Sequence, residues 1–313
     1  MDIKNVVVAG GGVLGSQIAF QSAYKGFNVK VWLRSEGSIE RAKPKFERWK
    51  NVYLQTLEAM KTNPAAYARG LAGSLELSDE QIEALKAQVE KAAESIVLTT
   101  SYDEAFGDAD LVIEAIAEEP KQKIELYTEM QKHLPERTIV CTNSSTMLPS
   151  QFAEYTGRPA KYLALHFANE IWKNNTAEVM GHPGTDPAVY EQVAEFAGKI
   201  GMIPLRLKKE QPGYILNSML VPFLTAAESL LANGVADPET IDKTWMLATG
   251  APVGPFRILD IVGLVTAHNI VVMNPQASDP ETTPGKIAAT LKKYIDEGKL
   301  GMSAGEGFYK YNK

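Results

Sequence analysis

Short β-branched apolar runs alternate along the first two thirds of the chain with longer stretches of helical spacing. Each run has the length and composition of a strand buried on both faces. The expected strands cover residues 3–9, 29–33, 96–99, 111–115, 138–142, 162–167, 177–180 and 202–207. The expected helices between them cover residues 13–25, 120–133 and 187–200. This alternation predicts a doubly wound, mostly parallel α/β sheet.

Two regions depart from the alternation. Residues 38–95 are helical in pattern and highly charged, with interruptions at Asn63-Pro64 and near Gly70, which predicts a helical hairpin inserted after the second strand. No strand pattern follows Gln211-Pro212-Gly213. The helices expected there cover residues 214–233, 238–249, 254–273 and 284–297. The 313 residues therefore predict two domains, an α/β domain at 1–186 and an all-α domain at 187–313, and the pattern allows the boundary to lie anywhere between Gly184 and Pro212.

Composition narrows the functional classes. Apolar residues make up 45% and charged residues 22%, and the net charge of −6 gives no reason to expect nucleic acid or an acidic membrane as partner. No run of 18 apolar residues predicts a membrane span, and the N-terminus does not resemble a signal peptide. A single cysteine, Cys141, excludes an intrachain disulfide and argues against a zinc cluster. We expect a cytoplasmic protein without a metal.

The first strand leads into a glycine loop. Gly10, Gly12 and Gly15 match G-x-G-x-x-G, with Val13 and Leu14 opening the helix that follows. The first glycine permits a tight turn, the second lets the backbone approach a pyrophosphate, and the third allows close packing of helix on strand. The free N–H groups of the helix then face the anion. The alternative is a structural turn, but the flanking strand and helix favour a Rossmann-type dinucleotide-binding domain.

The end of the second strand bears on the choice of cofactor. An aspartate or glutamate is expected there to bind the adenosine ribose, yet this chain has Leu33-Arg34-Ser35. Arg34 and Ser35 suit a ribose 2′-phosphate, which favours NADP over NAD. Two alternatives stay open: Arg34 is a solvated surface residue, or the nearby Glu36 reaches the ribose of NAD.

Candidate catalytic residues follow the later strands. Asn143 and Ser145 come directly after the strand at 138–142, at the sheet edge where α/β folds bind ligands. His166 and Glu178 lie at the next two strands, and Asn217 interrupts an apolar helix, where an unpaired amide is costly to bury. Each alone has a structural alternative: a core histidine, a helix cap or a strand-edge charge. Together they predict a polar site.

Motifs throughout the chain resemble those of the L-3-hydroxyacyl-CoA dehydrogenase family. The matching motifs are the glycine loop, Glu114-Ala115-Ile116 with Glu118, Asn143 to Ser145, His166-Phe167-x-Asn169, Glu178-Val179, Pro212-Gly213-Tyr214, Asn217 with Leu220-Val221-Pro222, Gly254-Pro255-Phe256, Leu259-Asp260, Val262-Gly263-Leu264 and the tail from Gly305 to Tyr311. The glycine loop is common to many dehydrogenases, whereas the Ser–His–Glu–Asn set with this tail is much more specific.

The resemblance implies a role for each matching residue. His166 would be the general base that takes the proton of a 3-hydroxyl as hydride leaves C3, with Glu178 orienting its imidazole. Ser145 and Asn217 would hydrogen-bond the substrate oxygen. Cofactor contacts are expected from Glu118, Lys123 and Asn143. The resemblance also implies a site between the domains and a homodimer formed through the C-terminal domain.

The chain departs from the family pattern at two positions. Glu170 replaces a proline after Asn169 in a segment that is more polar than usual, and Val265 stands where an aspartate is common. Glu170 brings the acyl-CoA substrate into question because its segment is expected to lie near the substrate. Val265 has no physical explanation in the sequence.

The inserted hairpin begins with a basic stretch. Seven basic and three acidic residues lie between Lys30 and Lys50, a local net charge of +4. Family members use this insertion to contact coenzyme A, so the stretch suits CoA phosphates, an NADP 2′-phosphate or plain solvation.

The leading hypothesis is a dehydrogenase of short 3-hydroxyacyl-CoA substrates such as 3-hydroxybutyryl-CoA. The alternatives are a dehydrogenase of a free 3-hydroxy acid, as in the related gulonate dehydrogenase branch, and a non-catalytic nucleotide-binding or structural relative.

Overall fold

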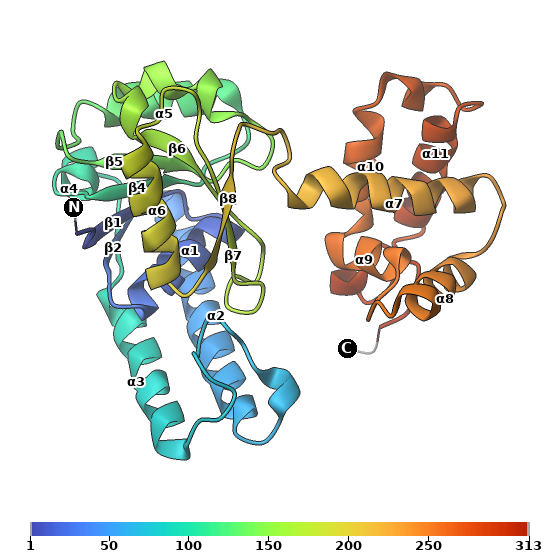
Figure 1. Cartoon of the computed structure of the whole chain (residues 1–313), viewed down its shortest axis with the longest axis horizontal. Helices are drawn as coiled ribbons and strands as arrows, with labels where there is room; N and C mark the ends of the chain where they lie inside the picture. The colour runs from blue at the N-terminus through green and yellow to red at the C-terminus, as the bar shows by residue number, and fades with distance from the viewer. Residues whose placement is uncertain (1, 312–313) are drawn as a thin grey trace. The chain divides into compact units, whose positions relative to one another are not determined.

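A computed structural model describes residues 2–311 and divides them into two compact units (Figure 1). The first unit extends to Ile215 and the second begins at Leu216. The sequence predicted a boundary after residue 186, about thirty residues earlier. Residues beyond that point stay with the first unit because α6 (Pro187–Lys199) and β8 (Ile203–Leu207) pack on and extend its sheet.

The first unit is built on one eight-stranded sheet in the order β3-β2-β1-β4-β5-β6-β7-β8. The other strands are β1 (Asn5–Ala9), β2 (Asn28–Trp32), β3 (Val97–Thr99), β4 (Leu111–Glu114), β5 (Ile139–Thr142), β6 (Tyr162–Phe167) and β7 (Thr176–Met180). All eight correspond to strands expected from the sequence. Every pairing is parallel except β6 with β7, so the mostly parallel sheet is confirmed. The order of the first six strands is that of a Rossmann domain.

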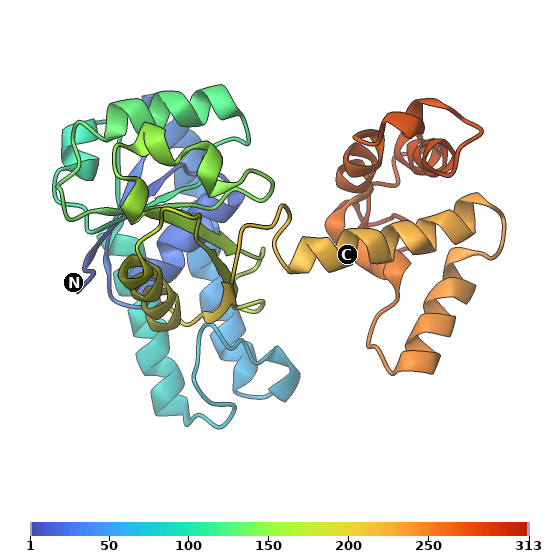
Figure 2. The same ribbon diagram turned by 45° about the horizontal axis from the view of Figure 1, so that its top comes forward.

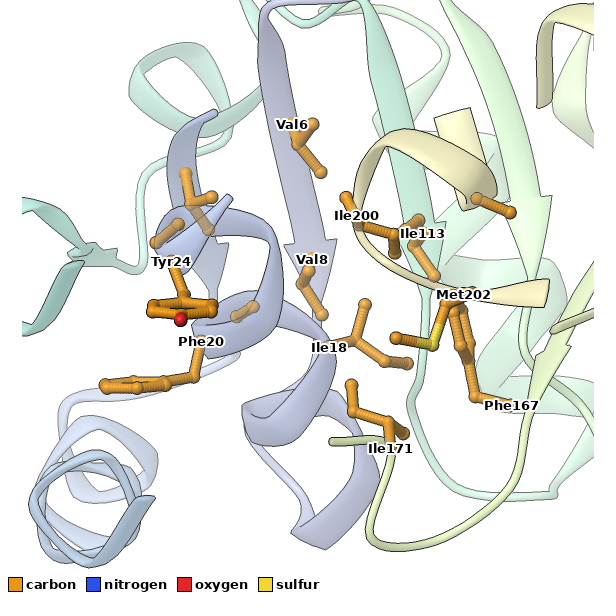
Figure 3. Packing of buried hydrophobic residues seen from close by; sticks show 14 of the residues in the cluster. Val6, Val8, Ile18, Phe20, Tyr24, Ile113, Phe167, Ile171, Ile200 and Met202 are labelled. Atoms are coloured by element: carbon orange, nitrogen blue, oxygen red, sulfur yellow. The ribbon is translucent and has the colours of Figure 1, made fainter. Parts of the chain in front are cut away.

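Alternating side chains of the buried strands divide the core into two layers. Val6 and Val8 of β1 face a cluster with α1 (Val13–Tyr24), whereas Val7 and Ala9 face the opposite side. Figure 3 shows the first layer, where Ile18 of α1 lies beside Ile113, Phe167 and Met202. The second layer is covered by α4 (Tyr102–Phe106), which the sequence did not predict, and α5 (Pro120–Met130).

The predicted hairpin is present as α2 (Glu36–Met60) and α3 (Asp79–Ser95). It is fastened to the sheet unit by Gln21 of α1, whose side chain is fully buried. The Gln21 amide nitrogen donates to the carbonyls of Gly70 and Ile200, at 2.9 and 2.7 Å, and its oxygen accepts from the Tyr53 hydroxyl at 2.7 Å. One amide thus joins α1, the hairpin and the turn before β8.

The second unit is all helical, as expected (Figure 2). Its helices are α7 (Leu216–Ala232), α8 (Pro238–Thr249), α9 (Pro255–Val262), α10 (Leu264–Val272) and α11 (Thr283–Asp296). The single helix predicted at 254–273 was wrong. Gly263 takes a φ of 91°, which ends α9, and α10 leaves at 96° to it. Within residues 2–311, no single helix has the length and apolarity of a membrane span; only the bent pair α9 and α10 passes that test together.

Two buried aspartates hold the C-terminal tail onto this unit. Asp260 accepts from the backbone N–H groups of Phe308 and Tyr309, at 2.8 and 3.0 Å, and from the Tyr311 hydroxyl at 2.8 Å. The Tyr309 hydroxyl donates to Asp242 at 3.0 Å. The tail motif therefore serves packing within the second unit.

Candidate active site

The glycine loop has the geometry that a bound pyrophosphate requires. Gly10 has a φ of 120°, and a Cβ there would lie 2.5 Å from the Ala115 carbonyl oxygen. A Cβ at Gly15 would lie 2.3 Å from the Gly10 carbonyl oxygen, whereas one at Gly12 would meet nothing within 4 Å. Gly12 is the N-cap of α1, and no side chain caps this helix. Open space thus lies at an uncapped helix N-terminus, which fits an anion.

A cavity of about 760 Å³ extends from this loop along the carboxyl ends of the strands. It is large enough for a small-molecule cofactor. The sequence-predicted cofactor residues that line it are Gly10, Gly12, Val13, Leu14, Gly15, Arg34, Glu118, Lys123 and Asn143. Ser35 does not line it; the Ser35 hydroxyl lies 3.0 Å from that of Ser38, which does. The lining residues therefore accommodate a dinucleotide at the position that the glycine loop predicts.

Three lining residues of helix α2 were missed by the sequence analysis. Ser38, Arg41 and Lys45 line the cavity beside Arg34. Their spacing of three and then four residues places them on one face of α2, and that periodicity was the signal available in the sequence. Arg41 donates to the Ser38 hydroxyl at 2.9 Å, and Lys45 donates to the Gly11 carbonyl at 2.7 Å.

No carboxylate takes the ribose-binding place at the end of β2. Leu33 is buried there, and Glu36, which the sequence left as an alternative, is not among the residues that line the cavity. Glu36 instead accepts a hydrogen bond from the Thr100 hydroxyl at 3.2 Å.

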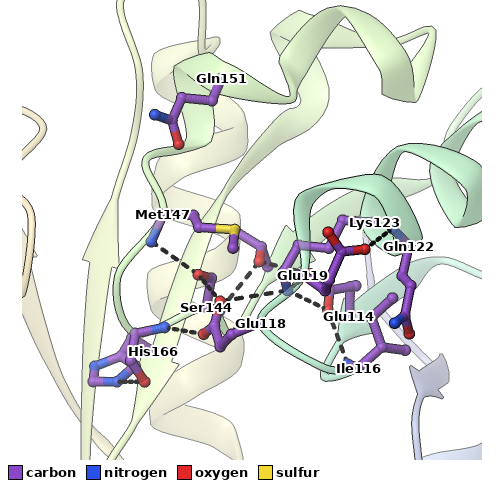
Figure 4. A network of polar contacts seen from close by, with 12 residues as sticks. Glu114, Ile116, Glu118, Glu119, Gln122, Lys123, Ser144, Met147, Gln151 and His166 are labelled. Atoms are coloured by element: carbon purple, nitrogen blue, oxygen red, sulfur yellow. Dashed lines mark hydrogen bonds and ion pairs between the residues drawn. The ribbon is translucent and has the colours of Figure 1, made fainter. Parts of the chain in front are cut away.

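A buried ionic network lies beneath the cavity (Figure 4). Glu114, at the end of β4, is fully buried and accepts two hydrogen bonds from Lys123, at 2.7 and 2.9 Å. The Tyr127 hydroxyl, the Thr142 hydroxyl and the Ile116 backbone N–H also donate to it, at 2.8, 2.7 and 2.9 Å. Burial and the Glu114 carboxylate raise the pKa of Tyr127 well above its ordinary value, so this phenol remains a donor. Lys123 thus neutralises Glu114 as well as lining the cavity.

The loop after β5 is ordered by Glu118. This carboxylate accepts from the Ser144 hydroxyl at 2.7 Å and from the Ser145 backbone N–H at 2.6 Å. Asn143 accepts from the Phe167 backbone N–H at 3.1 Å and so joins the ends of β5 and β6. These contacts hold the Ser145 side chain at the sheet edge.

His166 lies between two polar partners. Its Nε2 is 3.1 Å from the Ser145 hydroxyl, and its Nδ1 is 3.0 Å from Glu178 Oε2. The antiparallel register pairs His166 of β6 directly with Glu178 of β7, which places the two side chains on the same face of the sheet. Both are buried, at 6% and 4% exposed. The single antiparallel pairing in the sheet therefore forms this dyad.

Further contacts fix the dyad's orientation. The Tyr214 ring stacks on the imidazole, with centroids 4.4 Å apart and planes at 14°, and its hydroxyl donates to the Ser144 carbonyl at 2.7 Å. The second oxygen of Glu178 accepts from the Ile215 backbone N–H at 2.8 Å. Because a carboxylate only accepts, the hydrogen of a neutral His166 lies on Nδ1, and the unprotonated Nε2 accepts from the Ser145 hydroxyl. This arrangement can accept a proton at Nε2. Tyr214 belongs to the matching motif Pro212-Gly213-Tyr214, but the sequence did not predict its contact with His166.

The remaining expected residues lie as follows. Asn217 is in the first turn of α7, in the second unit. Glu170, which replaces the family's proline, has a φ of 58°, and its backbone N–H donates to Gln17 at 2.9 Å. Proline can satisfy neither feature, so this loop differs from the family pattern in its backbone. The structure does not explain Val265. Among residues 2–311, no group of three or more acidic, histidine or cysteine side chains is placed to hold a metal.

Comparisons with known proteins match the whole length of the described chain. The family model of the 3-hydroxyacyl-CoA dehydrogenase NAD-binding domain matches residues 5–211, and that of the C-terminal domain matches residues 213–311. The mitochondrial hydroxyacyl-coenzyme A dehydrogenase of Homo sapiens is 32% identical over 309 residues, covering 99% of this chain and 91% of that protein. A probable 3-hydroxybutyryl-CoA dehydrogenase of Bacillus subtilis is 29% identical, covering 100% and 99%.

A solved structure of a diketoreductase, described as a dual catalyst of dicarbonyl compounds, is 48% identical. It superposes with a TM-score of 0.84 over 99% of this chain and 100% of that one. The two domain matches agree with the structure, which has a Rossmann sheet with its glycine loop in the first unit and helices in the second. The chain belongs to the 3-hydroxyacyl-CoA dehydrogenase family and is an oxidoreductase with an NAD-binding domain.

Proposed function

We propose that this enzyme moves a hydride reversibly between a nicotinamide cofactor and the carbon of a 3-hydroxyl or 3-oxo group, with His166 as acid and base. The observation that carries the proposal is the placement of His166 between Ser145 and Glu178, at 3.1 and 3.0 Å. A bound nicotinamide would supply or take up the hydride.

Each residue of the site has a distinct task in this proposal. In oxidation, the lone pair of His166 Nε2 takes the hydroxyl proton of the substrate, and the Ser145 hydroxyl turns to hold the substrate oxygen. Glu178 stabilises the imidazolium that forms, through its bond to Nδ1. In reduction, Nε2 returns the proton, and Ser145 donates to the oxygen as it gains negative charge. Asn217 is assigned the second donor to that oxygen on the family resemblance.

The proposed cofactor is NADP in preference to NAD. Three observations support this preference: Leu33 replaces the ribose-binding acid, Glu36 does not line the cavity, and Arg34 does. An NAD-specific site needs an acceptor for the ribose 2′-hydroxyl, whereas a guanidinium is suited to a phosphate. Titration of the enzyme with NADPH and NADH tests the preference, with tighter NADPH binding expected.

The leading substrate candidate is a short 3-hydroxyacyl-CoA, such as 3-hydroxybutyryl-CoA, with acetoacetyl-CoA as its oxidised partner. It is supported by the family membership and by the relatives named 3-hydroxybutyryl-CoA dehydrogenases. His166 would perform the same proton transfer for the β-keto group of any 1,3-dicarbonyl compound.

A second candidate is a 1,3-dicarbonyl compound or free 3-hydroxy acid that carries no coenzyme A. It is favoured by the 48% identity to a diketoreductase, which exceeds the 32% identity to the human acyl-CoA enzyme. The rebuilt loop at Glu170 also favours it, because this loop follows the strand of His166 directly.

One turnover matrix separates the two candidates. The rates of NADPH and NADH oxidation are measured in the presence of acetoacetyl-CoA, acetoacetate or an uncharged 1,3-diketone. Turnover of acetoacetyl-CoA with a much higher kcat/KM than the other two supports the acyl-CoA substrate. Turnover of the CoA-free compounds alone refutes it, and no turnover of any compound would count against the proposed reaction.

We also propose a homodimer formed through the second unit. That unit leaves large apolar side chains exposed, including Met273 at 77%, Leu247 at 76% and Ile261 at 58%. Large apolar side chains exposed on one unit favour a protein interface there. Light scattering coupled to gel filtration tests it, and a monomer at micromolar concentration would contradict it.

A further inference from the structure

We propose that helix α2 of the inserted hairpin, together with Arg34, forms a binding site for the phosphate monoester on the adenosine ribose of the cofactor. Ser38 and Arg41 supply the donors from the helix. The cations of the hairpin that line the cavity would then serve cofactor selection. The inference rests on the proposed nicotinamide-dependent function and identifies how one part of its cofactor is recognised.

The donors share one end of the cavity. Arg34 follows β2, whereas Ser38 and Arg41 lie three residues apart on α2, and all three line the cavity that begins at the glycine loop. The guanidinium of Arg41 donates to the Ser38 hydroxyl at 2.9 Å, so these two donors of the helix lie together. Lys45, one turn further along α2, donates to the Gly11 carbonyl and joins the helix to the glycine loop.

The seven basic residues between Lys30 and Lys50 fall into two groups with one left over. Lys30, Lys43 and Lys50 form ion pairs with Asp108, Glu40 and Glu90. Arg34, Arg41 and Lys45 line the cavity. Arg48 lies over the Trp49 ring, 5.0 Å from its centroid. Three of the seven basic residues of this stretch therefore lie at the cavity without a carboxylate partner among the described residues.

The cavity cations call for an anion beyond the pyrophosphate. Across residues 2–311, Arg34, Arg41 and Lys45 form no ion pair with a carboxylate. The glycine loop and the N-terminus of α1 already suffice for the pyrophosphate. A phosphate monoester carries nearly two charges and three acceptor oxygens, which matches two guanidinium groups and a hydroxyl. A ribose hydroxyl would leave both arginines without a partner.

The experiment measures binding of cofactor fragments by calorimetry, so it needs no turnover. The probes are 2′,5′-ADP, which carries a 2′-phosphate beside its 5′-phosphate, 5′-AMP, which lacks only the 2′-phosphate, and 3′,5′-ADP, which has the phosphate arrangement of coenzyme A. Binding of 2′,5′-ADP should be at least about tenfold tighter than that of 5′-AMP, since a hydrogen bond between charged groups commonly contributes that much free energy.

Substitutions then locate the site. Arg34→Leu and Arg41→Leu should each lower affinity for 2′,5′-ADP by about tenfold and leave affinity for 5′-AMP unchanged. Lys43→Met is the matched control, because Lys43 lies on the same helix but pairs with Glu40, and it should change neither. Ser38→Ala should have a smaller effect in the same direction.

Two results would overturn the inference. Equal affinity of the wild-type protein for 2′,5′-ADP and 5′-AMP would show that these residues do not bind a 2′-phosphate. If the arginine substitutions weakened binding of 3′,5′-ADP and not that of 2′,5′-ADP, the hairpin would be a binding site for the phosphates of a CoA substrate. Failure of the proposed reaction is distinguishable, because it would abolish turnover while leaving the preference for 2′,5′-ADP intact.

Discussion

Replacing Lys123 with methionine should destabilise the first unit strongly, because it leaves the Glu114 carboxylate buried without a counter-charge. Glu114 is fully buried and Lys123 is 1% exposed, and their closest approach is 2.7 Å. Removing one partner of a buried ion pair typically costs about 3–5 kcal/mol. Three neutral donors remain on Glu114, from Ile116, Tyr127 and Thr142. We therefore expect the lower end, about 3 kcal/mol.

The assay is a double-mutant cycle read by thermal unfolding. For a unit of this size, 3 kcal/mol corresponds to a fall in Tm of roughly 6–12 °C. The partner variant Glu114→Gln keeps an acceptor for Tyr127 and Thr142 while removing the charge. The double variant Glu114→Gln, Lys123→Met has no uncompensated charge and should recover at least half of the lost stability.

Cofactor titration of the same variants below their melting temperatures separates two roles of Lys123. A variant with unchanged Tm and weakened cofactor binding would show that Lys123 acts only as a cofactor contact. Strict additivity in the cycle would refute the reasoning as well, because it would mean that the two side chains do not interact.

Three further changes should have defined effects. Burial raises the pKa of Glu228 from 4.5 to about 7, so its contribution to the free energy of unfolding should fall as pH rises between these values. Glu228→Gln should abolish this contribution and add about 3 kcal/mol to the free energy of unfolding above pH 7. Urea titrations at several pH values will show both effects. Glu170→Pro should lower the free energy of unfolding by at least about 2 kcal/mol, because proline cannot adopt the φ of 58° and lacks the N–H that donates to Gln17. Glu170→Gly should be tolerated, and equal Tm values for the two variants would contradict this reasoning. Asp260→Ala should lower the free energy of unfolding by about 3 kcal/mol and expose the C-terminal tail to proteolysis, because it leaves the N–H groups of Phe308 and Tyr309 unpaired. Unchanged protection of the tail would show that Asp260 does not hold it.

Periodicity in the sequence was sufficient to predict the architecture of the sheet. All eight strands were expected, because each is a short apolar or β-branched run; the central strands are buried along their length, whereas β3 and β8 at the sheet edges are partly exposed. The break at Gly263 was missed since apolar residues continue through it, and only its φ of 91° ends the helix. The strand at 202–207 was expected, but its place in the sheet depends on pairing with β7, a non-local feature; the structure therefore divides at residue 215 and not at residue 186.

The candidate site was predicted less completely. Ser145, His166 and Glu178 were identified through the family resemblance, yet their contact depends on the antiparallel register of β6 and β7, a non-local feature. The stacking of Tyr214 on the imidazole was not foreseen for the same reason. Ser38 and Arg41 were overlooked because a helix face becomes a cavity wall only once the hairpin has packed against the sheet unit.

The most direct test of the proposed chemistry is the kcat of His166→Gln, measured together with the Kd of its cofactor. Glutamine keeps hydrogen-bonding capacity at this position but cannot exchange a proton at neutral pH. The account predicts a kcat lower by about 10²–10⁴-fold for whichever substrate the wild-type enzyme turns over, with the cofactor Kd unchanged. A kcat within a few-fold of wild type would contradict the role of His166 as the acid and base of the reaction.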